Sequence, residues 1–305
     1  MKVDILTPLR YGGPRKWGDD LVKILEENNI EARNIYNFWE IIKRFFWTDA
    51  DIIHTTLPLF FSFHRKRIIL TIHGDYRREK NIWKYFWPLA IKNAKKITVP
   101  SNFLKNELKL NTAIVIPNSV NLDEFPKIIY IPKSIVTFIT ITNFNFIDKI
   151  NGLTYLIKIF DELSLKSSNF KFIIIGGGRY LDSFKEEYHN REFIHFLGFS
   201  NNVKQIIKEC DIFVYYSLHD NFPIVILEAM ASGLPVVSNN IGAIEEIISH
   251  GEDGFVFEDD FAFINKILEL IEDPSLRSEI GLRAINKVKN YFNSSILSKF
   301  LEVYE

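Results

Sequence analysis

The stretch from His219 to Asn240 limits the possible folds of this chain more than any other, because it combines the signals of a loop, a helix and a strand. Pro223 suits the first turn of a helix, where the N–H that proline lacks would have no partner. Gly233, followed closely by another proline, predicts a helix that ends in a left-handed cap. The β-branched residues from Val236 onward are typical of a buried strand. The side chains between Pro223 and Gly233 are apolar nearly all round, so we expect this helix to be buried on nearly every side.

One acidic residue, Glu228, interrupts the apolar helix. A buried carboxylate without a partner is costly, so Glu228 either reaches solvent or faces a cleft, where it accepts hydrogen bonds from hydroxyl groups. A second acid, Asp220, lies in the loop before the helix, and the N-terminus of a helix suits an anion. The ordinary alternatives for these positions are a satisfied core acid and a solvated loop residue.

Strand and helix patterns alternate along the whole chain. We expect strands at 3–6, 30–35, 52–54, 68–72, 96–100, 113–116, 135–141, 172–175 and 212–216, and helices at 17–28, 38–47, 153–163 and 203–209. This alternation predicts doubly wound α/β domains. A chain of 305 residues can form two such domains with full cores, and the segment 126–132, bounded by two prolines, is the expected linker.

The composition and the N-terminal residues indicate the cellular compartment in which we expect the protein. Cys210 is the only cysteine, so we expect neither a disulfide framework nor a cysteine metal cluster, which fits a reducing cytosol. The N-terminal residues MKVDILTP predict a strand and not a signal peptide. The sequence has no run of about 18 apolar residues that would predict a membrane-spanning helix. We therefore expect a cytoplasmic protein, attached peripherally to the inner face of the membrane if its basic half binds lipid.

Charge divides the chain into two unlike halves. Residues 1–127 contain 21 Lys and Arg against 14 Asp and Glu, whereas the remainder contains 16 against 24. The segment 64–96 concentrates ten of the basic residues and interleaves them with Trp83, Tyr85, Phe86 and Trp87. A basic aromatic helix here would suit an anionic membrane surface. A solvated helix whose aromatic residues are core is the competing interpretation, and a nucleic-acid partner is not expected although its binding face would also be basic.

Two features of the first half suggest a ligand site. Gly12 and Gly13 lie between a predicted strand and a predicted helix, which is typical of a loop that faces phosphate, although ordinary Gly-Gly turns are common. His73 follows the strand at 68–72, and ligands of open parallel sheets bind beyond the carboxyl ends of strands. A neutral histidine there can accept a proton or polarise a hydroxyl, whereas a structural histidine is the alternative.

The second half contains a glycine run, Gly176 to Gly178, directly after a predicted strand. A dinucleotide-binding fingerprint would need a further glycine at helix spacing and an acid about 20 residues later. Arg179 follows the run instead, so we do not expect NAD binding.

The run from Glu228 to Val237, preceded by Asp220 with seven residues between the two acids, resembles a signature of glycosyltransferase family 4, the retaining group 1 enzymes. That signature is Glu, seven residues, Glu, and then Ala-Met-Ala-x-Gly-x-Pro-Val-Val. Shorter matches are Thr71-Ile72-His73, Pro117 to Asn121, Gly176 to Gly178, and Gly242 with Glu246.

The resemblance implies a GT-B fold of two Rossmann-like domains with an interdomain cleft. It implies an acceptor-binding domain at 1–130 and a donor-binding domain at 131–305, with a terminal helix that crosses back to the first domain. The implied activity is retaining transfer of a sugar from a nucleotide-diphosphate donor to an acceptor hydroxyl, without a metal or another cofactor. In this family type, the acids of Asp49-Ala50-Asp51 are expected to be structural, because they precede a strand and do not follow one.

The resemblance also implies roles for individual residues. Glu228 would bind the ribose hydroxyls, and Asp220 the hydroxyls of the donor sugar with help from the backbone N–H groups of Asn221 and Phe222. Lys149 would take the charge of the diphosphate, and Gly177 would let the backbone approach the nucleotide. The Gly12–Gly13 loop would close on the donor phosphates, and His73 would lie beside the reacting centre. Because no side chain stands out as a nucleophile, the leaving phosphate oxygen would accept the acceptor proton.

The sequence departs from the family at two points. The first acid is Asp220 and not Glu, which shortens it by one methylene. The usual Arg position is most simply Asn143, and Lys149 is shifted by one position, so one cation for the leaving diphosphate is lost. Neutralising that charge is worth several kcal/mol in the transition state, although Asn143 or Asn145 could hydrogen-bond a phosphate.

These departures leave two other functions open. One is a nucleotide-sugar or glycan-binding protein with weakened catalysis, and the other is a basic peripheral membrane protein without a donor site. The sequence does not choose between UDP-, GDP- and ADP-sugars. Its basic aromatic half favours a glycan acceptor that is lipid-linked or close to a membrane.

Overall fold

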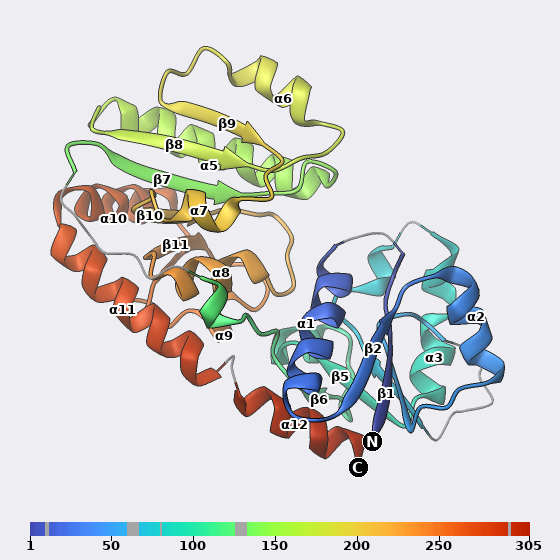
Figure 1. Ribbon diagram of the computed structural model, residues 1–305. Coiled ribbons are helices and arrows are strands. Elements are labelled where there is room, and N and C mark those ends of the chain that lie inside the picture. Colours follow the sequence, from blue (N-terminus) through green and yellow to red (C-terminus); the bar gives the residue numbers. More distant parts are fainter. Residues whose placement is uncertain (10–11, 60–66, 80, 126–132, 292–293) are drawn as a thin grey trace. The chain divides into compact units, whose positions relative to one another are not determined.

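The computed structural model describes the whole chain except residues 10–11, 60–66, 80, 126–132 and 292–293, together with the side chains of residues 45, 290–291 and 294–295. The chain forms two compact units (Figure 1). Unit 1 comprises Met1–Ser119 and Tyr291–Glu305, and unit 2 comprises Val120–Asn290. The first crossing between units thus falls before the expected boundary at residue 130, and the expected linker lies outside the described residues.

Unit 1 is built on a parallel sheet in the order β2-β1-β3-β4-β5-β6. Its strands are β1 (Lys2–Leu6), β2 (Glu31–Ile35), β3 (Ile52–Thr55), β4 (Ile68–Thr71), β5 (Lys96–Val99) and β6 (Ile114–Val115). Val3 in β1 pairs with Ala32 on one side and Ile52 on the other, so the first strand of the chain is an interior strand. The helices are α1 (Gly13–Glu27), α2 (Phe38–Phe46), α3 (Trp87–Asn93), α4 (Asn102–Glu107) and α12 (Ser294–Tyr304), with 3-10 turns at Tyr76–Arg78 and Ile82–Tyr85.

Helices cover both faces of this sheet. Ile68 packs in one cluster with Ile41 of α2, and Leu70 packs in another with Trp87 of α3. Residues two apart in a strand point to the same face, so α2 and α3 lie on one face of the sheet. On the other face, Trp17 of α1 lies 6.1 Å, ring to ring, from Phe300 of α12.

The C-terminal helix α12 is held in unit 1 by polar contacts as well as by packing. Tyr304 forms a 2.8 Å hydrogen bond with Nδ1 of buried His54. Lys95 and Lys96 donate hydrogen bonds of 2.8 Å to the carbonyl oxygens of Glu305 and Glu302. The last turn of the chain is therefore part of the first unit.

Unit 2 is built on a second parallel sheet, in the order β12-β11-β10-β7-β8-β9. Its strands are β7 (Val136–Ile141), β8 (Phe170–Ile175), β9 (Ile194–Gly198), β10 (Ile212–Tyr215), β11 (Val236–Asn239) and β12 (Phe255–Phe257). Its helices are α5 (Ile147–Ser164), α6 (Leu181–Tyr188), α7 (Val203–Ile207), α8 (Ile224–Ser232), α9 (Ile244–Ile247), α10 (Asp260–Glu272) and α11 (Pro274–Tyr291), and a 3-10 turn spans Leu122–Glu124. Phe138, Phe160 and Phe172 are fully buried in its core.

The expected doubly wound α/β fold class is confirmed by these two parallel sheets. The opening stretch also folds as expected: α8 ends at a left-handed Gly233 with φ of 87°, and β11 follows. Six of the nine side chains of α8 are buried. Among the described residues, no helix combines the length and apolar character needed to cross a bilayer.

Three expectations about helices were wrong. The single basic helix expected within 64–96 is replaced by two 3-10 turns and the short α3, because Asn81 caps a new turn and Pro88 can stand only at a helix start. Helix α1 begins at Gly13 and not at Trp17, since Pro14 fits its first turn. Helix α5 begins at Ile147 and not at 153.

Candidate functional site

Lys149 and Asp220, two residues predicted to act on the donor, form an ion pair in unit 2. Lys149 lies in the first turn of α5, and Asp220 lies in the loop between β10 and α8. Lys149 Nζ is 2.5 Å from Asp220 Oδ2 and donates a second hydrogen bond of 3.0 Å to the hydroxyl of Tyr215. That hydroxyl donates in turn to Asp220 Oδ2 at 2.6 Å. The three side chains therefore form a closed cluster at the carboxyl end of β10.

Two glycines allow the backbone segments around this cluster to approach closely. A Cβ on Gly152 of α5 would lie 2.5 Å from the carbonyl oxygen of Tyr216, so only glycine lets the helix start against the end of β10. Gly242 has φ of 62°, and a Cβ there would lie 2.1 Å from the carbonyl oxygen of Asp220. Gly242, which matches a family motif, thus allows the loop that carries Asp220 to pack closely against it.

The ion pair keeps its charges although both side chains are largely removed from water. Burial raises the pKa of Asp220, but Lys149 and the hydrogen bond from Tyr215 outweigh burial, so the pKa lies below its usual value. Burial lowers the pKa of Lys149, and Tyr215 with Asp220 reverses that effect and raises the pKa above its usual value. At neutral pH the cluster therefore contains an ammonium and a carboxylate.

The predicted residues Asn143, Asn145 and Gly177 lie on neighbouring loops beyond β7 and β8. Asn143 Oδ1 accepts hydrogen bonds from the backbone and side-chain N–H groups of Asn145, at 3.0 and 2.9 Å. Asn145 Oδ1 accepts from the backbone N–H of Arg179 at 3.2 Å. The amide oxygen of Asn145 thus joins the two loops, whereas that of Asn143 bonds within its own loop. A phosphate contact from either residue would have to come from its Nδ2 group.

The other predicted donor residues, Asn221, Phe222 and Glu228, lie on the loop before α8 and on α8 itself. The backbone N–H of Phe222 donates to Asp220 Oδ1 at 3.3 Å, so in this structure it contacts the acid, and its expected part in placing the donor sugar stays a prediction. The reason is local, because an aspartate readily accepts a hydrogen bond from the N–H two residues later. Asn221 has a buried Oδ1 without a partner among the described residues. Glu228 is half-buried on α8, and its role stays a prediction.

In unit 1, His73 lies beside the start of α1. Its ring is 4.8 Å from that of Trp17, one turn after the exposed Gly12–Gly13 pair. Burial lowers the pKa of His73 to about 4, so the imidazole is neutral at pH 7. Within the described part of the chain, its buried Nε2 has no hydrogen-bond partner. An added Cβ on Gly12 or Gly13 would contact nothing within 4 Å, so these glycines are not needed for packing.

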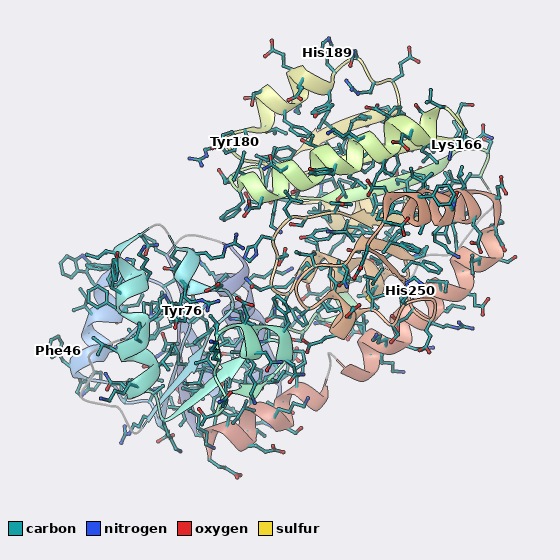
Figure 2. The ribbon with its side chains drawn as sticks, turned by 180° about the vertical axis from the view of Figure 1, so that it is seen from behind. Phe46, Tyr76, Lys166, Tyr180, His189 and His250 are labelled. Carbon is teal, nitrogen blue, oxygen red and sulfur yellow. The ribbon has the colours of Figure 1, made fainter. Side chains whose placement is uncertain are left out.

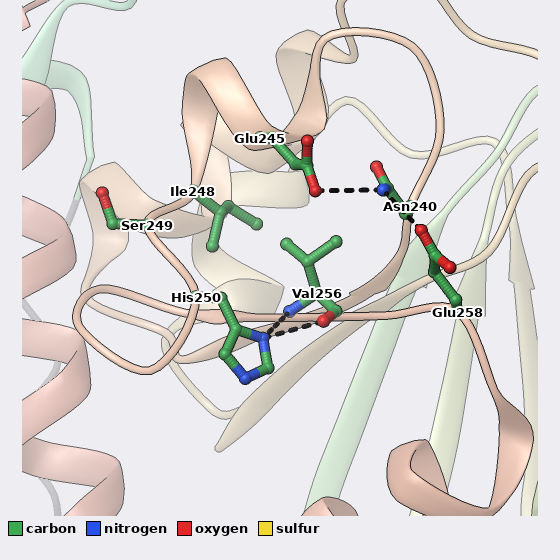
Figure 3. A pocket seen from close by; sticks show the side chains of 7 residues that line it. All are labelled: Asn240, Glu245, Ile248, Ser249, His250, Val256 and Glu258. Carbon is green, nitrogen blue, oxygen red and sulfur yellow. Dashed lines mark hydrogen bonds between the residues drawn. The ribbon is translucent and has the colours of Figure 1, made fainter.

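A separate polar pocket of about 410 Å³ opens near the ends of β11 and β12 (Figure 3). Its lining consists of Asn240, Glu245, Ile248, Ser249, His250, Val256 and Glu258. Asn240 Nδ2 donates to both glutamates, at 3.0 and 3.3 Å. None of the predicted site residues lines this pocket, and its two carboxylates would repel a diphosphate.

The acids at 49 and 51 have structural partners in unit 1. Asp49 lies 2.6 Å from both Lys2 Nζ and Arg33 Nη2, and Asp51 accepts a 2.8 Å hydrogen bond from the backbone N–H of Lys2. These contacts hold the segment before β3 against the start of β1. They agree with the structural interpretation of the Asp-x-Asp string.

Sequence reasoning missed Tyr215, which contacts both charged members of the cluster. The available signal was its place as the last residue of a predicted strand, five positions before Asp220. An aromatic residue at the end of a buried strand is ordinarily a packing residue, so the sequence did not indicate that this hydroxyl would bond to Lys149 and Asp220.

Two family models match the chain. One, described as glycosyltransferase family 4, matches residues 2–124, and the other, described as glycosyl transferases group 1, matches residues 137–287. A glycosyltransferase of Methanocaldococcus jannaschii is 30% identical over 78% of this chain and 68% of that protein.

More distant similarities concern parts of the chain or its fold alone. The UDP-Gal:alpha-D-GlcNAc-diphosphoundecaprenol alpha-1,3-galactosyltransferase of Escherichia coli is 32% identical over 40% of this chain, and the chain spans only 33% of that relative. The solved structure of Anabaena HepE in complex with UDP matches 99% of both chains with a TM-score of 0.80 at 18% identity, which shows a shared fold.

Proposed function

This chain belongs to the family 4 glycosyltransferases and has their two-domain GT-B type of fold, and on that premise we propose that it transfers a sugar from a nucleotide-diphosphate donor to an acceptor hydroxyl with retention of configuration. In this proposal unit 2 binds the donor and unit 1 binds the acceptor. The reaction needs no metal, because Lys149 and the start of α5 supply the positive charge.

The observation that carries the proposal is the placement of Lys149. An ammonium group has three N–H donors, and among the described residues Asp220 and Tyr215 accept two of them. The third is available to a diphosphate oxygen of the donor. As the bond between the sugar and the diphosphate breaks, Lys149 stabilises the charge that develops on the leaving oxygen.

The remaining roles follow from the chemistry of each side chain. Asp220 Oδ1, which among the described residues accepts only a long 3.3 Å bond from Phe222, binds hydroxyls of the donor sugar. Glu228 binds the ribose. The leaving phosphate oxygen accepts the proton of the acceptor hydroxyl, and the new bond forms on the face of the sugar that the diphosphate leaves. On the acceptor side, the neutral Nε2 of His73 hydrogen-bonds the attacking hydroxyl.

We favour a UDP-hexose donor and a lipid-linked acceptor among the possible substrates. HepE, which shares the fold, was solved with UDP and with UDP-glucose. The E. coli relative is named for a UDP-galactose donor and a diphosphoundecaprenol acceptor. Both names describe those proteins, and the assignment to this chain is our proposal.

Transfer is tested with isotope-labelled UDP-, GDP- and ADP-sugars and a membrane extract as the source of acceptor. We expect label in the lipid fraction with one donor, and at least about a tenfold loss of turnover, or about 1.4 kcal/mol, in each of Lys149→Ala, Asp220→Ala and Glu228→Ala. Wild-type turnover in all three variants would refute the assignment of the site.

A second candidate function is binding of a nucleotide sugar without efficient transfer. It is favoured by Asn143, which stands where the family usually has Arg, and by the pairing of Lys149 with Asp220. This candidate predicts a thermal shift with nucleotide sugars, together with neither transfer nor donor hydrolysis. Measuring binding and turnover on the same sample separates it from the enzyme.

A further inference from the structure

Helix α2 of unit 1 presents an aromatic face to solvent. Phe38 is 56% exposed, Trp39 73% and Phe46 62%, and Trp47 directly after the helix is 57% exposed. Figure 2 shows Phe46 projecting outward from this helix. Contiguous exposed apolar surface on a soluble protein usually marks an interaction site, so this face needs an explanation beyond the core.

The opposite side of α2 is fixed to the sheet by buried polar and apolar contacts. Ile41 packs on the core. Arg44 is buried and its Nε donates a 2.8 Å hydrogen bond to Asp4 of β1, which is fully buried and also accepts from Thr48. Because this network determines the rotation of α2, the aromatic side chains cannot turn inward without breaking a buried ion pair.

Two further exposed aromatic side chains belong to the segment just before α3, and α3 lies on the same face of the sheet as α2. Trp83 is 48% exposed and Tyr85 is 68% exposed, whereas Trp87 is buried against the sheet. Thus the aromatic residues of 64–96 divide between surface and core, and the expected membrane surface stays a prediction. We call Phe38, Trp39, Phe46, Trp47, Trp83 and Tyr85 the aromatic face.

Basic residues accompany the aromatic face. Lys43 lies within 5.9 Å of the ring centre of Trp47, and Lys84 lies 5.0 Å from that of Tyr85. Unit 1 as a whole contains 21 Lys and Arg against 14 Asp and Glu, and unit 2 contains 16 against 24. Tryptophan and tyrosine favour the headgroup region of a bilayer, and lysines beside them are attracted by anionic lipid.

We propose that the aromatic face is a docking surface for an anionic lipid bilayer, with α2 lying in the plane of the headgroups. Its aromatic rings enter the boundary between headgroups and acyl chains, while Lys43 and Lys84 contact lipid phosphates. This inference goes beyond the proposed transfer reaction and does not depend on it. It also fits the geometry of an interfacial helix, which needs an apolar outer face but no membrane span.

The test is co-sedimentation of the full chain with vesicles of phosphatidylcholine, alone or mixed with phosphatidylglycerol. Because three of the five tryptophans belong to the aromatic face, a blue shift of their fluorescence provides a second readout. The variant is Trp39→Gln/Trp47→Gln, which removes aromatic surface without changing charge. The matched control is Phe261→Gln/Leu282→Gln in unit 2, where the side chains are 71% and 60% exposed.

We expect binding to the anionic vesicles, a loss of about tenfold in the partition coefficient for the aromatic variant, no loss for the control, and weaker binding at high salt. Equal binding of the aromatic variant and wild type would overturn the proposal. The proposal would also be overturned if the wild type bound no vesicles but formed concentration-dependent dimers that the aromatic variant abolishes. The aromatic face would then join two copies of the chain. Since no donor is present, failure here leaves the transfer proposal untouched.

Discussion

The two units share an architecture, but their candidate site residues differ in charge. Both are six-stranded parallel sheets with helices on each side. In unit 1, buried His54 and half-buried His73 contact Trp17 and stay neutral, since burial lowers their pKa to about 3 and about 4, with a smaller effect of His73 on His54. In unit 2, Lys149 and Asp220 stay charged because each is the other's partner.

This difference shows what each unit can do chemically. Desolvation favours the neutral form of an isolated base, whereas a pair of opposite charges can keep both ionised. A neutral imidazole such as that of His73 suits hydrogen bonding to a hydroxyl. An ammonium kept charged by a carboxylate, as in Lys149, suits binding to a diphosphate. The same fold thus presents an uncharged site in the basic unit and a charged site in the acidic unit.

The largest expected effect comes from removing the cation of unit 2. Lys149→Met leaves Asp220 largely buried without its partner, so we expect a loss of about 2 to 3 kcal/mol in the free energy of unfolding, less than for a fully buried pair because Lys149 is 25% exposed. Transfer should also fall at least about tenfold. Chemical denaturation followed by circular dichroism, and the transfer assay, measure the two effects.

The double variant Lys149→Met/Asp220→Asn separates the structural role of the pair from its catalytic role. Removing the orphaned charge should restore most of the stability but none of the transfer. Recovery of transfer in this variant would show that Lys149 does not act on the donor.

A smaller effect is expected from Gly242→Ala, which disturbs the loop of Asp220 without touching a charge. The new Cβ would meet the carbonyl oxygen of Asp220, so this variant should lose about 2 kcal/mol more stability than Gly251→Ala. Gly251 has a φ of 81° but open space around its Cβ position, so the control isolates backbone strain. If both variants lose the same stability in thermal unfolding, the Asp220 loop adjusts to the added Cβ without cost, and the prediction is wrong.

Acidification should weaken unit 1 through its neutral histidines. Between pH 6.5 and the folded pKa, the unfolded chain binds a proton at His54 that the folded unit does not, so stability falls as pH falls. From pH 7 to pH 5 the loss at His54 is about 2 kcal/mol, and His73, whose pKa burial lowers to about 4, adds a similar loss. All five tryptophans lie in unit 1, so urea unfolding followed by their fluorescence reports this unit.

His54→Gln should remove the share of this loss that comes from His54 and leave the share from His73, whereas His250→Gln on the surface of unit 2 should retain both. If the slope with pH is the same in both variants, His54 is not the group responsible.

The smallest effect concerns the tyrosine hydroxyls that serve each unit. Tyr304→Phe removes the hydrogen bond between α12 and His54 and should cost about 1 kcal/mol of stability with no change in donor affinity. Tyr215→Phe should instead weaken nucleotide-sugar binding, because the hydroxyl orients Lys149 and Asp220. Isothermal titration with both variants checks this, and identical donor affinities would contradict the orienting role of Tyr215.

The sequence predicted the members of the donor site better than their contacts. Lys149 and Asp220 could each be identified from a motif, but their direct pairing could not, since they are 71 positions apart and meet only because α5 starts early against β10. Tyr215 was missed because an aromatic residue at the end of a buried strand is ordinarily a packing residue. The helix at 38–47 that carries the aromatic residues of α2 was predicted, but which of its sides would face water depended on the Arg44–Asp4 contact.

By itself the sequence determined the alternation of strands and helices, the end of α8 at Gly233 and the family of the chain. These follow from local signals, such as the period of apolar residues and the backbone preferences of glycine and proline, that act over a few neighbouring positions. Only the tertiary structure decided that Lys149 is held by Asp220 and Tyr215, that His73 packs on Trp17, and that α2 turns its aromatic side outward. Each of these depends on which elements pack together and on the burial that results, and burial sets both the charge of a side chain and the surface left for a partner.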